Sequence, residues 1–572
     1  MSTFAQGGYR NVFHRLCLCL SVLTAAVPQP GDAQILLAGG SLPVCSSMTT
    51  RNCKTRTEWP EQALDTYLSR ATETRVERWQ ASLGEFADPT AASKWRAALD
   101  QMASENLEAV TRGEWAEQFS PALAEWYDTL DSRSRSQLFD HFQEPVGAHR
   151  ETVRLKDSRS EAAIEIFERF VAMARETTGR ERPRIGFSTA SSRDPYDALE
   201  FYWQVFDQAG AEAHWLPLDR AFTAARAADR CENLADFQAE LLGTWDRERV
   251  FPDAFRLQQR LCNDPDATLE LAENLDGLFL NGGDQWLTLH AFIDEDGRPT
   301  PEWRRIMVRL EAGEMVLGGT SAGAAVQSGP VMISNGSSRR ALLEGAHEQP
   351  PPGPGCDRAG TCPPGLSADS LTFHRGGLGS FSPGIVDTHF SERWRQFRLL
   401  QLMLDSDVAL GLGVDETSAI EVTGLFDDQP LALQAHGDSG GWLIMTDSGI
   451  VESRHPLQIR QVGLHHLAPG AVLQLDGGTA PDSGNGNQTK HLDPKDAENC
   501  YDISQYDSFE TLPLTRAGKQ DDAPPCFSWA LDAGHSARSQ LRVIQPPASA
   551  RGPVSSWDWS LQVSVIAAAA PD

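Results

Sequence analysis

The chain has 572 residues, 40% of them hydrophobic, and carries 79 Asp and Glu against 50 Lys and Arg, a formal net charge of -29. This length exceeds one ordinary domain and predicts either one large elaborated domain or two to three smaller ones. So acidic a surface repels nucleic acid and anionic lipid, which argues against both as partners. It favours cationic partners, or serves solubility alone.

The first 33 residues predict a secretory signal peptide. A basic leader precedes an apolar run from Leu16 to Val27 that is too short to cross a bilayer. Small residues at Gly31-Asp32-Ala33 suit cleavage, so we expect a mature chain from near Gln34 and a secreted or periplasmic location. No later segment is apolar enough to predict a membrane span.

Cysteine usage agrees with export. Removing two cysteines with the signal peptide leaves eight of the ten, and an even count in an exported chain indicates disulfides. A zinc site is the competing interpretation, but the chain has no Cys-x-x-Cys. Pairing of sequence neighbours closes the shortest loops and predicts four disulfides: Cys45/Cys53, Cys231/Cys262, Cys356/Cys362 and Cys500/Cys526.

The predicted elements begin with a buried strand over Ile35 to Gly40 that ends in a glycine turn. From about residue 59 to 179 the chain is charged and shows helical spacing, as at Leu64, Tyr67 and Leu68 on one face. We therefore predict a helical subdomain inserted over 59–179, with its tryptophans as core anchors.

Strands and helices then alternate. The pattern predicts strands and helices in the order Arg184–Thr189 (strand), Pro195–Ala209 (helix), His214–Leu218 (strand), Leu275–Leu280 (strand), Pro301–Ala312 (helix) and Met315–Leu317 (strand). This alternation predicts an α/β fold with a mostly parallel, doubly wound sheet, whose functional residues gather at the carboxyl ends of strands.

The domain organisation follows from these patterns. We expect the α/β domain to comprise residues 34–58 and 180–475. Glu348 to Gly365, rich in proline and glycine, predicts a surface loop stapled by its two cysteines at the rim of the site. Residues 476–572 predict a glycine-rich linker and a small C-terminal extension.

The most informative motif is Gly319-Thr320-Ser321-Ala322-Gly323, between an apolar strand and a segment of small residues that can start a helix. Gly-x-Ser-x-Gly in this context is the nucleophile-elbow pattern. Side chains at the two glycines would collide with neighbouring backbone, and the turn presents the Ser321 hydroxyl at a helix N-terminus. The motif predicts a serine nucleophile.

Such a serine needs a base and an acid that orients the base. His389 ends an apolar strand in Asp387-Thr388-His389, and Asp415-Glu416 ends another after Gly411 to Val414. We expect His389 as the base and favour Glu416 over Asp415 as the acid, although the sequence separates the two acids poorly.

The remaining site residues follow from the same strand ends. The N–H of Ala322 is a predicted oxyanion-hole donor, and Gly282 or Gly283 could supply the second. Gln285 can hydrogen-bond a substrate amide or carboxylate. Arginines after His389 can bind a carboxylate, with Arg395 and Arg398 on one helix face and Arg393 near the helix start.

Two other motifs look catalytic and are interpreted as structural. Gly437-Asp438-Ser439-Gly440-Gly441 imitates the serine motif of chymotrypsin-like proteases, but no matching histidine segment precedes it, and we interpret it as a β-hairpin turn. His465-His466 lacks suitably spaced acid or cysteine ligands, so we expect no metal there.

Together these motifs resemble the cyanophycinases, S51 serine peptidases related to dipeptidase E. The resemblance covers residues 34–48 and 181–470 and rests on four ordered motifs: Asn281 to Gln285, Gly319 to Ala324, Asp387 to Phe390 with Arg393, Arg395 and Arg398, and Gly413 to Glu416. It implies a flavodoxin-like or class I glutamine amidotransferase-like fold, no cofactor and no metal, and a homodimer.

The resemblance also implies roles. Ser321, His389 and Glu416 would form the triad, with a substrate pocket that uses Gln285, Asp387, Thr388, Arg393, Arg395 and Arg398. Position 388 is commonly glutamine in this family, and threonine here puts one pocket hydrogen bond in doubt. The implied reaction is cleavage of cyanophycin, a poly-aspartate with arginine on each side chain, to β-Asp-Arg dipeptides. Dipeptidase-E-like cleavage of short aspartyl peptides and a catalytically silent peptide-binding protein are the alternatives.

Overall fold

A computed structural model describes residues 34–475, except 57, 66, 71, 73, most of 78–120, 129, 131, 427–429, 447–449 and 455–456. Beyond 475 it describes only the strands at 501–502, 526–530, 535–544 and 557–567. The predicted signal peptide lies outside the described residues.

An eight-stranded sheet forms the centre of the α/β part, in the order β18-β14-β13-β1-β7-β6-β4-β5. The strands β1, β7, β6, β4 and β5 pair in parallel, and β13, β14 and β18 continue the sheet antiparallel. This confirms the predicted α/β class with a mostly parallel sheet. The bounds are β1 Gln34–Ala38, β4 Arg184–Ser188, β5 Glu212–Trp215, β6 Gly277–Leu280, β7 Val316–Thr320, β13 Ser418–Thr423, β14 Leu431–Gly437 and β18 Val472–Leu475.

Two adjacent glycines in β7 show that helices cover both faces of this sheet. A Cβ on Gly318 would lie 2.6 Å from the ring of Phe170 in α5, Glu161–Thr178. A Cβ on Gly319 would lie 2.2 Å from the carbonyl of Gly323 in α14, Ala322–Ala325. Because neighbouring strand residues point to opposite faces, α5 and α14 pack on opposite sides of the sheet.

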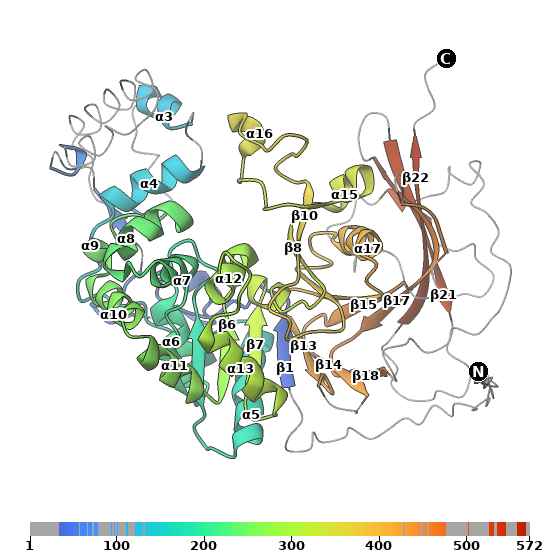
Figure 1. The fold of residues 1–572 in the computed structure, drawn as a ribbon, viewed down its shortest axis with the longest axis horizontal. Coiled ribbons are helices and arrows are strands. Elements are labelled where there is room, and N and C mark those ends of the chain that lie inside the picture. The colour runs from blue at the N-terminus through green and yellow to red at the C-terminus, as the bar shows by residue number, and fades with distance from the viewer. Residues whose placement is uncertain are drawn as a thin grey trace, which may run out of the picture.

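Helices surround the parallel strands (Figure 1). Their apolar faces join one continuous core with the fully buried strands, as expected for a parallel sheet covered on both sides. The bounds are α6 Leu199–Gln208, α7 Arg220–Ala227, α8 Leu234–Phe237, α9 Arg247–Val250, α10 Pro252–Cys262, α11 Pro265–Glu273, α12 Gln285–Phe292 and α13 Pro301–Glu311.

A second sheet of nine strands lies beside the first, in the order β11-β12-β15-β17-β22-β21-β20-β19, with β16 on β17. Strands β20 to β22, from the predicted C-terminal extension, therefore continue the sheet that holds β11 and β12 (Figure 1). The bounds are β11 Ile385–Thr388, β12 Leu410–Val414, β15 Gly441–Met445, β16 Ile450–Arg454, β17 Leu457–Leu467, β19 Tyr501–Asp502, β20 Cys526–Ala530, β21 His535–Ile544 and β22 Trp557–Ala567.

Smaller elements complete the described part. A three-stranded sheet has the order β8-β10-β9, and β2 pairs with β3. The bounds are β2 Leu68–Ser69, β3 Val110–Thr111, β8 Val331–Asn335, β9 Ala346–Glu348, β10 Leu371–Arg375, α3 Pro121–Asp128, α4 Ser132–Phe142, α15 Ser338–Glu344, α16 Cys356–Ala359 and α17 Gln396–Asp405. None of the described helices is long and apolar enough to cross a membrane.

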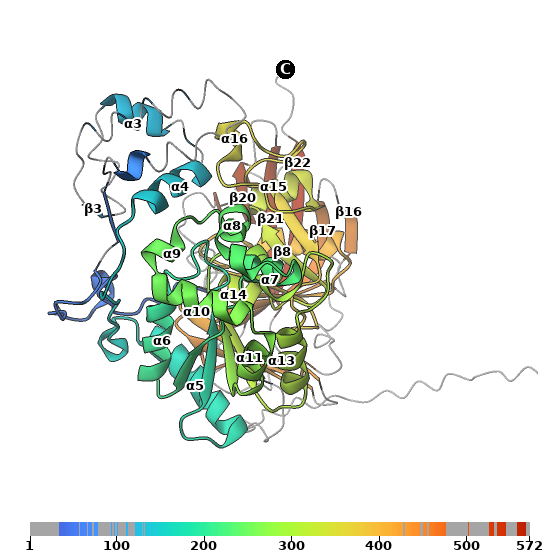
Figure 2. The same cartoon turned by 60° about the vertical axis from the view of Figure 1, so that its left-hand side comes forward.

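The predicted helical insertion contains two kinds of helix. Helices α3 and α4 lie above the α8–α9 segment (Figures 1 and 2), where Arg249 of α9 donates to the backbone of His141 and Gln143. Helix α5 instead packs on the central sheet, where Phe167 and Phe170 are buried in the main core. The domain boundaries from the sequence stay a prediction.

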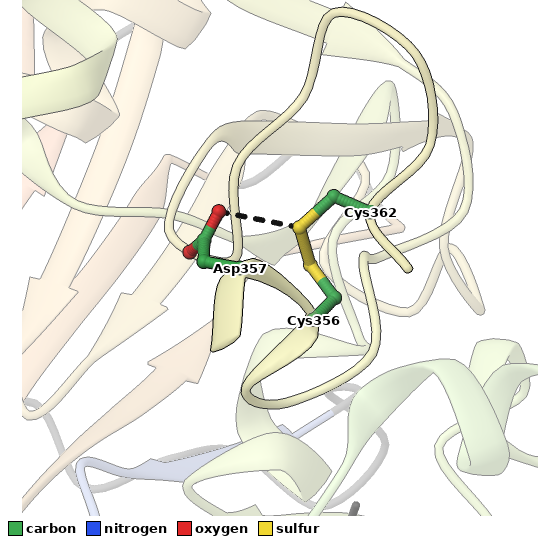
Figure 3. Close-up of side chains that lie close together, drawn as sticks. All are labelled: Cys356, Asp357 and Cys362. Atoms are coloured by element: carbon green, nitrogen blue, oxygen red, sulfur yellow. Dashed lines mark hydrogen bonds between the residues drawn. A yellow bond between two sulfur atoms is a disulfide. The ribbon is translucent and has the colours of Figure 1, made fainter. Parts of the chain in front are cut away.

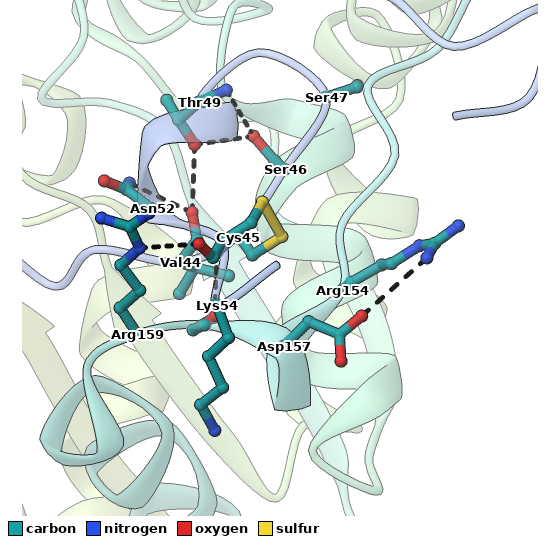
Figure 4. Close-up of a disulfide and its surroundings, with 12 residues drawn as sticks. Val44, Cys45, Ser46, Ser47, Thr49, Asn52, Lys54, Arg154, Asp157 and Arg159 are labelled. Carbon is teal, nitrogen blue, oxygen red and sulfur yellow. Dashed lines mark hydrogen bonds and ion pairs between the residues drawn. A yellow bond between two sulfur atoms is a disulfide. The ribbon is translucent and has the colours of Figure 1, made fainter. Parts of the chain in front are cut away.

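Three of the four predicted disulfides are present: Cys45–Cys53, Cys231–Cys262 and Cys356–Cys362. The fourth pair falls outside the described residues at Cys500. The Cys45–Cys53 loop begins seven residues after the end of β1 and is held by further bonds, since Asn52 donates to the Val44 carbonyl and Arg159 to the Cys53 carbonyl (Figure 4). The end of β1 is thereby anchored.

Candidate active site

Ser321 lies on the turn between β7 and α14, with φ 52° and ψ -114°. Few side chains adopt this backbone conformation, and it is typical of a nucleophile elbow. Both flanking glycines are required: a Cβ on Gly319 would lie 2.2 Å from the Gly323 carbonyl, and one on Gly323 would lie 2.1 Å from the Leu280 carbonyl. The turn presents the serine hydroxyl at the carboxyl end of the parallel strands.

His389 follows β11 directly and faces the serine. Its Nε2 lies 2.7 Å from Ser321 Oγ, which is hydrogen-bonding distance. Its backbone N–H donates to the Gly39 carbonyl over 2.9 Å, and its φ is 47°. The imidazole is thus held between the end of β1 and the elbow.

Glu416 completes a chain of three side chains. Its Oε1 lies 2.6 Å from His389 Nδ1, and the Ser41 hydroxyl also hydrogen-bonds this carboxylate. Asp415 points elsewhere and is fully buried, accepting the Ser391 N–H over 2.8 Å and the Trp442 indole N–H over 3.0 Å. The geometry therefore shows that Glu416, and not Asp415, faces His389, a choice that the sequence left open.

The sequence predicted one sheet whose strand ends carry the site, but the three side chains follow strands of two different sheets. Ser321 follows a strand of the eight-stranded sheet, whereas His389 and Glu416 follow β11 and β12 of the nine-stranded sheet. The chain passes from one sheet to the other directly after Glu416, where β13 begins at Ser418. Since β13 pairs with β1, the chain enters the eight-stranded sheet next to β1. The three side chains therefore meet where the two sheets join.

The end of β1 contacts all three segments, a role that the sequence did not predict for it. Carbonyls of Ala38, Gly39 and Gly40 accept the N–H groups of Ser321, His389 and Thr417 in turn. A glycine pair after a buried first strand was the available signal. Sequence alone could not show which segments come close enough to exclude a side chain there.

We predict that Gly40→Ala disables the site. The new Cβ would lie 2.3 Å from His389 Cε1, and the φ of +114° disfavours any L side chain. A displacement of the imidazole by ~1 Å should lower kcat by about 100-fold. Gly297→Ala is the matched control, since Gly297 also has a positive φ of +77° but has nothing within 4 Å. Equal kcat in the two variants would contradict the contact.

The electrostatics favour a neutral imidazole beside an ionised carboxylate. Burial, followed by the positive charge of Arg393, lowers the pKa of His389 to about 4. Burial opposes ionisation of Glu416, but hydrogen bonds from Ser41 and His389 outweigh it and lower the pKa of this carboxyl. A neutral His389 can accept a proton from the serine.

The predicted oxyanion-hole residues lie next to the serine. A Cβ on Gly282 would lie 3.3 Å from Ser321 Cβ, which places the loop after β6 against the elbow. Gly283 has φ +148°, and a Cβ there would lie 2.1 Å from the Ser191 carbonyl. Ala322 begins α14, where the first N–H groups have no acceptor within the helix. The backbone N–H groups of Gly283 and Ala322 remain predicted hydrogen-bond donors to the oxyanion.

Asp387 and Arg398 form a buried pair. Arg398 Nε and Nη2 lie 2.8 and 2.6 Å from the two Asp387 oxygens, and both residues are almost fully buried. Arg395 lies 3.5 Å from the same carboxylate and donates to the Thr388 carbonyl over 2.7 Å. Asp387, Arg395 and Arg398 thus hold one another in place at the end of β11. Their contacts with substrate remain a prediction.

Of the predicted pocket residues, Arg393 is exposed and Gln285 is partly buried. The Gln285 amide donates to the Ile333 carbonyl over 2.8 Å, which fixes the orientation of its side chain. Arg393 is exposed and close enough to His389 to lower the pKa of the imidazole. Burial, together with the charges of Arg398 and Arg393, lowers the pKa of Arg395 to about 9.

The serine in the protease-like decoy motif is part of a turn. Ser439 lies between β14 and β15, and the N–H groups of Ser439 and Gly440 donate to Ser418 Oγ. The predicted hairpin was wrong, because β14 and β15 belong to different sheets and the turn carries the chain between them. His436 pairs with Glu421, and His466 packs on Trp442.

One group of potential metal ligands occurs among the described residues: Cys356, Asp357 and Cys362 (Figure 3). The two sulfurs are joined in a disulfide, so neither is available as the thiolate that a metal requires. The group is a stapled loop, as the sequence predicted.

No family model matches the chain. It is 31% identical to a cyanophycinase of Geminocystis herdmanii (strain PCC 6308) over 218 residues, 35% of this chain and 63% of that protein. It is 26% identical to a cyanophycinase of Trichormus variabilis (strain ATCC 29413 / PCC 7937) over 297 residues, 52% of this chain and 72% of that protein. The chain thus spans less than two thirds of the Geminocystis protein.

Among solved structures, a peptidase from an acI-B1 actinobacterium matches 56% of this chain and 92% of its own, at 19% identity and a TM-score of 0.31. A TM-score this low supports no inference about the chain. The relatedness therefore rests on the sequence matches.

Proposed function

We propose that this chain, a sequence relative of the cyanophycinases, is a serine-type peptidase that cleaves cyanophycin to β-Asp-Arg dipeptides. The observation that carries the proposal is the continuous contact from Ser321 Oγ to His389 Nε2 and from His389 Nδ1 to Glu416 Oε1. This is the arrangement of nucleophile, base and orienting acid that acyl transfer needs.

In the acylation step, Ser321 Oγ attacks the scissile carbonyl carbon while its proton passes to His389 Nε2. Negative charge then develops on the carbonyl oxygen, which would accept hydrogen bonds from the N–H groups of Gly283 and Ala322. Glu416 keeps the proton of neutral His389 on Nδ1 and stabilises the imidazolium that forms. When the tetrahedral intermediate collapses, the peptide C–N bond breaks and the leaving amine takes the proton from Nε2.

Deacylation repeats the sequence with water. His389 Nε2 accepts a proton from a water molecule, whose oxygen attacks the acyl carbon of the Ser321 ester. Collapse of the second intermediate breaks the ester bond and returns the proton to Ser321 Oγ. The chain's own residues carry every proton transfer.

The substrate class is supported by the named relatives and by charge. Arginines beside the site suit aspartyl carboxylates, while the net charge of -29 favours approach of a polymer rich in guanidinium groups. We also propose that the protein works outside the cytoplasm. Three disulfides in the described residues support this location, because disulfides persist in oxidising compartments.

The test is to incubate the purified protein with insoluble cyanophycin and identify soluble products by mass spectrometry. We expect clearing of the polymer and release of β-Asp-Arg. Cleavage of short aspartyl or isoaspartyl dipeptides without clearing would favour a dipeptidase-E-like activity instead. Binding of the polymer without cleavage of either substrate would favour a silent binding protein.

The pH dependence of kcat/KM tests the base. His389 acts only when neutral, so activity should rise with pH through its folded-state pKa of about 4. We expect the acid limb to be centred near pH 4, well below the value of about 6.5 for an unperturbed imidazole.

Arg393→Gln should move this acid limb to higher pH, because it removes a positive charge that disfavours the imidazolium. Arg375→Gln is the control, since Arg375 is a 74% exposed arginine paired with Glu348. A wild-type limb near pH 6.5, or equal limbs in the two variants, would contradict the assignment.

A further inference from the structure

A buried charge cluster lies outside the triad, between the predicted helical insertion and the α/β part. It consists of Asp140 in α4, Arg193 and Asp194 after β4, and Arg247 in α9, and we call it the α4 cluster. Arg193 donates two hydrogen bonds to Asp140, from Nη1 and Nη2 to the two carboxylate oxygens over 2.7 and 3.0 Å. Arg247 lies 3.5 Å from Asp140 and also pairs with Asp194.

Asp140 is the shared acceptor of this cluster. It is fully buried, as is Arg247, and it also accepts the Trp245 N–H over 3.1 Å. Burial opposes ionisation of Arg193, but its hydrogen bond to Asp140 outweighs this and raises its pKa. Two planar guanidinium groups converge on one carboxylate, so its loss would leave neighbouring positive charges without their common partner.

The segment that Arg193 anchors is also bonded to the predicted oxyanion loop, Asn281 to Asp284. The Ser191 N–H and hydroxyl bond to the Asn281 side chain and carbonyl at 2.9 and 2.8 Å. The Ser191 carbonyl accepts the Asp284 N–H over 2.8 Å. Asn281 Nδ2 in turn donates to Ser192 Oγ over 2.9 Å.

Gly283 lies directly against this segment. Its Cβ, if present, would be 2.1 Å from the Ser191 carbonyl, so the two backbones touch. A shift of Ser191 must therefore displace the Gly283 peptide. Arg193, two residues along the chain, fixes this segment through its own bonds to Asp140, Gly243 and Thr244.

We propose that Asp140 is a positioning residue for the oxyanion loop, acting through Arg193 and Ser191 on the Gly283 amide. The proposal rests on the proposed peptidase function. It gives α4, which lies in the segment outside the sequence resemblance, a defined part in catalysis: it fixes the angle of a backbone donor without touching substrate.

The position of an oxyanion-hole donor must be accurate, so a carboxylate that lies far from the substrate can still affect kcat. A donor stabilises the transition state only at about 2.7–3.1 Å from the developing oxyanion, and loss of one such donor costs ~100- to 1,000-fold in kcat. Binding of the uncharged ground-state carbonyl depends far less on that donor. Disturbing Asp140 should thus lower kcat with little change in KM.

The first test is hydrogen–deuterium exchange on the full-length protein, and it needs no activity. Asp140→Asn should raise exchange in peptides covering residues 189–194 and 281–286. Glu421→Gln is the matched control, because Glu421 is also buried and held by two Arg169 nitrogens at 2.8 Å each. Glu421 lies in β13, about 10 Å along the strand from Ser418 at ~3.4 Å per residue.

The second test compares steady-state kinetics on cyanophycin. We expect Asp140→Asn to lower kcat by about 10- to 100-fold with KM within about twofold, and Glu421→Gln to leave both near wild type. Arg193→Lys keeps the charge but loses the two-pronged contact, and it should show the same split if Asp140→Asn does not fold.

The outcomes separate the two proposals. Unchanged exchange at 281–286 in Asp140→Asn, or in Arg193→Lys where the first variant does not fold, overturns the positioning role. So does a kcat equal to that of Glu421→Gln. Raised exchange at 281–286 together with an inactive wild type would leave the positioning contact standing and overturn the peptidase function instead.

Discussion

Ser321→Ala is expected to abolish hydrolysis of cyanophycin while the fold stays intact. The variant removes the Oγ atom of the proposed nucleophile, so kcat should fall by roughly 10⁴- to 10⁶-fold. The free energy of unfolding should change by less than about 0.5 kcal/mol, because alanine meets the same backbone strain at φ 52° as serine does. Product release by mass spectrometry and thermal unfolding measure the two effects.

Ser439→Ala is the control for this experiment. Ser439 lies in the protease-like motif, but its described contacts run from its backbone to Ser418 and His466. We expect full activity from this variant. Loss of activity in Ser439→Ala with retention in Ser321→Ala would reverse the assignment of the nucleophile.

Glu416→Gln should be the second-largest loss. The amide can present its NH₂ group to His389 Nδ1, which favours the tautomer that carries a proton on Nε2 and cannot accept one from serine. By analogy with other triads, kcat should fall by roughly 10³- to 10⁴-fold with little effect on stability. Steady-state kinetics and denaturant unfolding measure the two effects.

Asp415→Asn, in contrast, should affect the stability of the fold more than it affects kcat. Both Asp415 oxygens accept buried N–H groups, at 2.8 Å from Ser391 and 3.0 Å from Trp442. An asparagine can satisfy only one of them, so the free energy of unfolding should fall by about 1–3 kcal/mol. A larger loss of kcat in Asp415→Asn than in Glu416→Gln would contradict Glu416 as the orienting acid.

The fold could be predicted where local patterns suffice. The buried runs at 35–40, 184–189 and 275–280 correspond to β1, β4 and β6, because parallel strands covered on both faces are continuously apolar. The helix predicted from Pro301 to Ala312 is α13, Pro301–Glu311. The second sheet escaped prediction, because it pairs strands as distant in sequence as β17 and β22, and sequence patterns do not encode which strands pair.

The site, like the fold, has features that could be predicted from the sequence and features that could not. The serine turn was predictable because its steric requirement lies within five consecutive residues, Gly319 to Gly323. The acid was not, because Asp415 and Glu416 are neighbours and only their tertiary surroundings show which one faces His389. Likewise, the buried pair of Arg398 and Asp387 was not predictable, because the two residues come from α17 and β11 and their contact forms only in the folded chain.

The sequence by itself therefore determined the serine turn, the alternation of strands and helices that is typical of a mostly parallel sheet, and three disulfide pairs, since each depends on a local pattern of residues along the chain. Only the tertiary structure decided that two sheets meet at the site, that Gly40 leaves room for the imidazole, and that Asp140 pairs with Arg193. Those features depend on contacts between residues far apart in sequence, whose distances are set by packing.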